Sequence, residues 1–76
     1  MNAKDRKKLG EAIGQLEAAR GIIETLAEEE QSKVDNTPEG LQDTEKAQAM
    51  AEKADLLSDL VEALGEAIGS AEEAKA

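Results

Sequence analysis

Apolar residues follow a helical repeat in two long stretches of the chain. The spacing alternates steps of three and four and uses Leu9, Ala12, Leu16, Ala19, Ile23 and Leu26, then Ala47, Met50, Ala54, Leu57, Val61, Leu64, Ile68 and Ala71. This is the heptad seam of packed helices, and the strict alternation of a strand occurs nowhere. Ala, Glu, Lys, Gln and Leu, which are good helix formers, dominate both stretches. We therefore predict an all-α protein with helices over about 4–32 and 44–74.

The stretch between the two helices, about 33–43, has the composition of a connection. It contains the only proline of the chain, Pro38, and the preceding Thr37 suggests an N-cap with proline at the first helical position. We expect one short turn over the segment PEGLQ, and either Asp43 or Thr44 should cap the second helix. Residues 1–76 thus form one helical-hairpin domain.

The two seams also predict how the chain folds back. If the helices lie antiparallel, the seam pairs 9/71, 12/68, 16/64, 19/61, 23/57 and 26/54 meet in layers centred on Gly40. Gly40 lies inside the proposed connection. The seams and the turn residues thus predict the same midpoint for a coiled-coil-like, antiparallel two-helix hairpin.

A second apolar stripe runs beside the seam of the second helix, where the first helix cannot cover it. We expect Ile22 to extend this surface from the first helix; the stripe itself contains Leu56, Leu60, Ala63 and Ala67. Because a 76-residue chain with 14 Leu, Ile and Val residues has a thin core, an uncovered stripe favours self-association. We predict a homodimer in which two hairpins form a four-helix bundle.

Composition removes most catalytic chemistry. Cys and His are both absent, so disulfides, thiol chemistry, zinc fingers and histidine acid/base catalysis are excluded. Asp35, Thr37, Glu39 and Gly40 fit the start of an EF-hand loop, but Lys46 stands where that loop needs a bidentate glutamate. Without a nucleophile and base pair or a phosphate-binding loop, we predict no enzyme activity, no cofactor and no metal site.

The net charge of −9 limits the possible partners. Residues 9–76 carry 5 basic and 17 acidic side chains, so we expect no direct binding to nucleic acid. No apolar run approaches the length of a membrane span and residues 1–8 are too polar for a secretory signal, which predicts a cytoplasmic protein.

The midsection EEEQSKVDNTPEGLQDTEKAQAM resembles a group of short acidic helical-hairpin proteins common in bacteriophage and prophage genomes. The residues that match the group's pattern are Glu28, Glu29, Glu30, Asp35, Asn36, Pro38, Glu39, Leu41, Gln42, Thr44, Glu45 and Lys46. Val34 and Thr37 depart from it, since the group often has an aromatic residue and a leucine there. The resemblance covers about a third of the chain. It implies a viral or mobile-element origin, with the host cytoplasm as the location, and specifies no activity.

We expect the connection to be ordered, either as a recognition loop or as structure alone; its residues are Asp35, Asn36, Pro38, Glu39, Leu41 and Gln42. Leu41 should pack under the loop against the last turn of the first helix. Asp35 or Asn36, together with Thr37, should accept hydrogen bonds from nearby backbone amides.

Three functions remain open. The first is a self-associating protein-interaction factor, a phage accessory protein that binds a host protein and acts in counter-defence. The second is an acidic DNA mimic that inhibits a nucleic-acid-binding host enzyme. The third is an oligomeric sponge for a nucleotide messenger, for which the plausible phosphate contacts are Lys4, Arg6, Lys7, Lys8 and Arg20.

Overall fold

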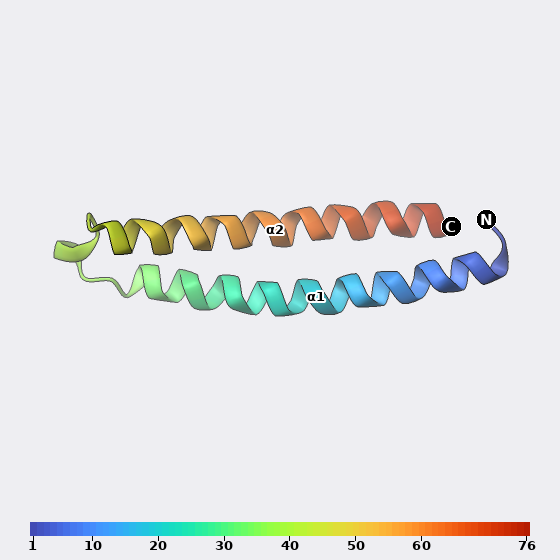
Figure 1. Cartoon of the computed structure of the whole chain (residues 1–76), viewed down its shortest axis with the longest axis horizontal. Coiled ribbons are helices and arrows are strands. Elements are labelled where there is room, and N and C mark those ends of the chain that lie inside the picture. Colours follow the sequence, from blue (N-terminus) through green and yellow to red (C-terminus); the bar gives the residue numbers. More distant parts are fainter.

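The computed structural model describes all 76 residues as two long helices that lie side by side (Figure 1). The elements are helix α1 (Ala3–Asp35), the short 3-10 turn η1 (Glu39–Leu41) and helix α2 (Glu45–Lys75). The chain reverses at η1, so both termini lie at the opposite end of the rod, which we call the open end (Figure 1). The hairpin measures 59 × 15 × 13 Å. The predicted all-α antiparallel hairpin is confirmed, and its midpoint Gly40 lies within η1.

Helix α1 ends later than predicted, and its C-terminal hydrogen bonds explain the difference. The backbone amide of Asn36 donates to the carbonyl of Ser32 at 3.0 Å. The hydroxyl of Thr37 donates to the carbonyl of Lys33 at 2.8 Å. Thr37 therefore closes α1, and the prediction that it caps the following turn is wrong. The residue that precedes η1 is Pro38, which makes no capping hydrogen bond through its side chain.

Helix α2 begins with a side-chain cap, as predicted. The hydroxyl of Thr44 accepts a hydrogen bond from the amide of Ala47 at 3.2 Å. The same hydroxyl donates to the carbonyl of Leu41 at 2.8 Å, which connects the cap to η1. Of the two candidates, Thr44 rather than Asp43 is the capping residue. At the start of α1, Asn2 plays the equivalent part and accepts from the amide of Asp5 at 2.8 Å.

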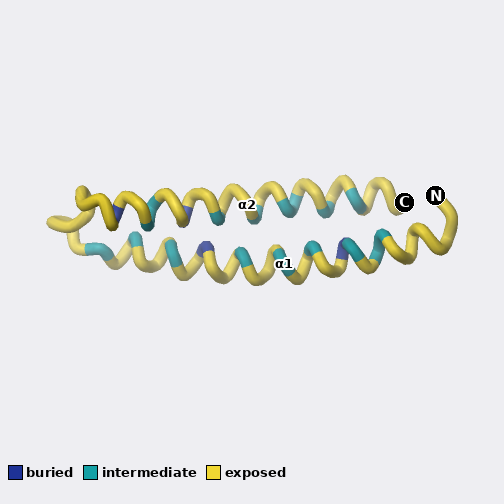
Figure 2. Tube along the Cα trace, viewed as in Figure 1, coloured by how far each residue is buried: buried dark blue, intermediate teal, exposed yellow.

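The predicted seam of α2 is confirmed along its whole length. Its eight members are all buried or half-buried on the edge that faces α1 (Figure 2): Ala47, Met50, Ala54, Leu57, Val61, Leu64, Ile68 and Ala71. The three and four spacing thus predicts which edge of this helix packs against its neighbour.

The predicted seam of α1 is correct from Leu9 to Ile23 and then shifts by one residue. Leu26 is 45% exposed, whereas Ala27 is 8% exposed and faces α2. A straight helix has 3.6 residues per turn, so a strict 3.5-residue repeat drifts around it. Along the 33 residues of α1, the step of four residues from Ala19 to Ile23 is followed by another step of four, from Ile23 to Ala27, and this extra residue corrects the drift. Leu26 is thereby excluded from the contact between the helices.

The core of the hairpin is small and built mainly from alanine. The only buried residues are Ile13, Ala27, Ala47 and Ala54. Three of the four are alanines, and they lie in the half of the rod that is closer to the connection. The larger seam residues are only half-buried, because each helix has one neighbour and two open sides (Figure 2).

No helix here has the length and apolar character that crossing a membrane requires.

Candidate interaction surface

One face of the hairpin carries an uncovered run of apolar side chains. The predicted self-association residues Ile22, Leu56, Leu60, Ala63 and Ala67 are all exposed. Ile22 and Leu56 are 65% and 67% exposed, so most of each of these large apolar side chains is open to solvent. We call this set, together with Leu26, the apolar strip. Sequence reasoning missed Leu26, although the drift of a heptad repeat on a straight helix was a signal that could have found it.

The apolar strip is continuous across both helices. Leu26 of α1 and Leu56 of α2 line one shallow hollow, together with Leu57, Glu30 and Lys53. Residues four apart on a helix share a face, so Ile22 lies one turn beyond Leu26 in the direction of the open end. By the same rule Leu60 lies one turn beyond Leu56. The four large side chains therefore form one surface, and Ala63 and Ala67 continue it along α2.

The total accessible surface of this elongated hairpin is larger than that of a compact protein of the same mass. The chain exposes 5636 Å² at a mass of 8.0 kDa. A compact monomer of this mass is expected to expose about 4,450 Å². The excess is therefore about 1,200 Å², more than the ~800 Å² that each partner buries in a standard protein interface. A second body can cover the apolar strip and bring the exposed surface to an ordinary value.

The predicted recognition-loop residues all lie at the exposed tip of the rod. Asp35, Asn36, Pro38, Glu39, Leu41 and Gln42 are exposed, and hydrogen bonds within the connection fix its path. The amide of Leu41 donates to the carbonyl of Pro38 at 2.8 Å. The amide of Thr44 donates to the carbonyl of Leu41 at 3.3 Å. The connection is therefore a hydrogen-bonded tip on which these six residues are exposed.

Two expectations about this tip are wrong. Leu41 is 53% exposed and therefore does not pack under the loop. The expected side-chain bonds to amides are also absent. The carboxylate of Asp35 accepts from the side chain of Gln31 at 3.0 Å, and Thr37 donates to a carbonyl. Both interactions extend the last turn of α1 instead of bracing the connection.

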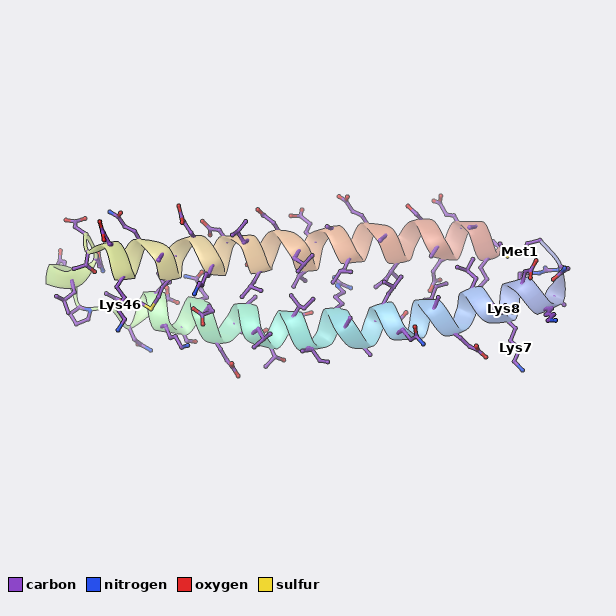
Figure 3. The ribbon with its side chains drawn as sticks, in the orientation of Figure 1. Met1, Lys7, Lys8 and Lys46 are labelled. Carbon is purple, nitrogen blue, oxygen red and sulfur yellow. The ribbon has the colours of Figure 1, made fainter.

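The structure separates the basic residues that a nucleotide sponge would use. Arg6 and Lys7 border a shallow hollow at the open end, together with Lys75, which sequence reasoning did not include. Figure 3 shows Lys7 projecting away from the hairpin. Arg20 lies farther along α1, against Gly65 of α2. Arg20 is therefore separated from the basic residues at the open end.

Acidic side chains are spread over the rod with few partners. The single ion pair joins the ammonium of Lys33 to the carboxylate of Glu30 at 3.0 Å. No group of three or more side chains is arranged to hold a metal ion.

Comparisons with protein-family models, with curated proteins and with solved structures find no match for this chain.

Proposed function

We propose that this protein is a non-enzymatic, self-associating interaction factor, in which two hairpins pack through the apolar strip to form a four-helix bundle. The observation that carries this proposal is the position of Leu26, Leu56, Ile22 and Leu60 on one face, outside the contact between α1 and α2. Contiguous apolar patches of this kind on a soluble chain mark sites of association. A helix pair with one apolar face has the shape of half a four-helix bundle.

The proposal is tested by the mass of the protein in solution. Leu60→Glu places a carboxylate in the centre of the apolar strip, and we expect light scattering to give a monomer mass where the unchanged protein gives a dimer. Leu41→Glu is the matched control, because Leu41 is also a large exposed leucine but lies at the tip. This control should remain a dimer. A monomer mass for the unchanged protein at high concentration contradicts self-association.

We further propose that the bundle is a phage or prophage accessory factor that binds a host protein, in counter-defence. The support is the resemblance of the midsection, whose matching residues are all exposed except Glu30 and lie at or near the tip, where a partner can reach them. Affinity capture from host lysate tests this role. We expect one host protein to be retained by the unchanged protein and lost when Pro38, Glu39 and Gln42 are replaced by alanine. Retention of no protein at native expression contradicts the accessory role and leaves self-association standing.

An acidic DNA mimic is the second candidate, and the scarcity of ion pairs favours it. Of 18 acidic residues, only Glu30 pairs with a basic side chain within the chain, so the other carboxylates are free to face a cationic surface. Charge of one sign steers association and is screened by salt. If mimicry is correct, affinity for a captured nucleic-acid-binding enzyme falls steeply between low and physiological ionic strength. Affinity that is independent of salt excludes it.

A further inference from the structure

We infer that the two copies in the dimer lie antiparallel, with the connection of each hairpin at the open end of the other; this inference rests on the proposed self-association. Ile22 and Leu60 lie near the middle of the rod. Leu60 is the central residue of α2 (Glu45–Lys75), and Ile22 is about midway between Ala3 and Gly40. If the two-fold axis of the dimer crosses the hairpin at Ile22 and Leu60, the two copies therefore overlap along their whole length.

The sizes of the side chains on either side of this axis are complementary. One turn from Ile22 toward the connection is Leu26, and one turn in the other direction is the exposed Ala18. The axis places Leu26 of one copy over Ala18 of the other, so a large side chain meets a small one. On α2 it places Leu56, four residues before Leu60, close to Ala63, which is three residues after it. Packing of large against small residues fills the space between helices without voids.

A parallel dimer lacks this complementarity. With both connections at the same end, Leu26 of one copy lies over Leu56 of the other, and Ala18 lies over Ala63. Large residues then meet large ones in one half of the rod, and alanines meet alanines in the other half. Helices that pack at one spacing cannot close both halves, so the alanine half is left with a gap that costs stability.

Charge favours the same arrangement. Glu11 and Lys33 are both exposed and lie at equal distances from Ile22 along α1, so the antiparallel axis places each beside the other in the second copy. Residues 4–8, which contain Lys4, Arg6, Lys7 and Lys8 against Asp5, then lie near the acidic tip of the partner. A parallel dimer brings the two acidic tips together, and like charges at close range repel.

Spin labels at the tip measure the arrangement directly. The chain has no cysteine, so Gly40→Cys gives a single labelling site, and Gly40 is exposed with open space around its Cβ position. An antiparallel dimer separates the two labels by a distance close to the 59 Å length of the hairpin. A parallel dimer brings them within roughly 20 Å, because packed helix axes are only 8–10 Å apart. A short distance in a protein of dimer mass overturns the antiparallel inference alone, whereas a monomer mass overturns the self-association on which it rests.

Charge reversal gives a second readout. Glu11→Lys should weaken dimerisation several-fold, and Lys33→Glu should do the same. The double variant should recover most of the loss, because the two residues meet between copies. Within one hairpin they are 22 residues apart on a helix, roughly 33 Å, which is too far for direct coupling. Additive effects in the double variant contradict the antiparallel arrangement. Glu17→Lys is the control, since Glu17 points away from the apolar strip and lacks a basic residue at the corresponding distance.

Discussion

The guanidinium of Arg20 on α1 lies over the backbone of Gly65 on α2, with its Nη2 atom 3.3 Å from the position that a Cβ atom would occupy there. Gly65 is half-buried, whereas Gly69, one turn farther along α2, has open space around its Cβ position. A methyl group added at Gly65 would therefore contact Arg20, whereas one added at Gly69 would contact nothing.

This difference predicts the effects of two alanine substitutions. Gly69→Ala should stabilise the protein by about 0.5–1 kcal/mol, because glycine is that much poorer than alanine in a helix interior. Gly65→Ala should gain less, since the guanidinium must shift by a few tenths of an ångström. In an Arg20→Ala background the two gains should become equal. Urea denaturation at a fixed protein concentration measures all five variants; equal gains with Arg20 in place contradict the contact.

The stability of the fold should depend on protein concentration. If the apolar strip is covered in the proposed dimer, mass action predicts a midpoint of thermal unfolding that falls on dilution. For a hundredfold dilution of a dimer with two 76-residue chains, the expected decrease is roughly 5–10 °C. Circular dichroism over that range checks it. A constant midpoint shows that the hairpin is stable alone.

Neighbouring residues on α1 should respond differently to changes of size. Ala27 is buried against α2, so Ala27→Leu overpacks the contact and should cost about 1–3 kcal/mol in the free energy of unfolding. Leu26→Ala should preserve helicity at high concentration while raising the dimer dissociation constant, because Leu26 belongs to the apolar strip. Circular dichroism and light scattering distinguish the two effects. If the heptad seam of α1 did not shift, Leu26 would face α2 in place of Ala27, and Leu26→Ala would be the variant that opens a cavity in the core.

Thr44 and Thr25 offer a matched pair of threonine hydroxyls. Thr44 caps α2, and Thr44→Ala should cost about 1 kcal/mol, while Thr44→Ser retains the cap. Thr25 lies within α1, where its hydroxyl donates to the carbonyl of Gly21 at 3.2 Å. Because alanine is the better helix former there, Thr25→Ala should be neutral or stabilising. Chemical denaturation compares them, and a loss of equal size at both positions contradicts the capping role.

Much of the fold was predictable from local pattern. Two helices and a short turn could be predicted from the helical period, the position of Pro38 and the capping threonine, because each of these signals acts within a few residues. The seam of α2 was correct for the same reason. The shift at Ala27 was missed, because a small mismatch between 3.5 and 3.6 residues per turn accumulates along a helix and appears only after several turns.

The candidate surface was predictable on α2 and only partly on α1. Its α2 members follow from a second stripe beside an uninterrupted seam. Leu26 could not be assigned until the register of α1 was known, since one residue of rotation moves a side chain from the contact to the surface. The exposure of Leu41 depends on how closely η1 approaches α1, which the chain pattern does not specify. The Arg20 and Gly65 contact joins residues far apart in sequence and needs the three-dimensional structure.

The ion pair between Lys33 and Glu30 lies within a single turn of α1, and no ion pair joins α1 to α2. The path of the backbone thus does not depend on ion pairs between the helices. Mutations can exchange acidic for neutral or basic residues over most of the rod while the seams and the apolar strip are retained. One architecture can therefore display many different charge patterns without a change of fold.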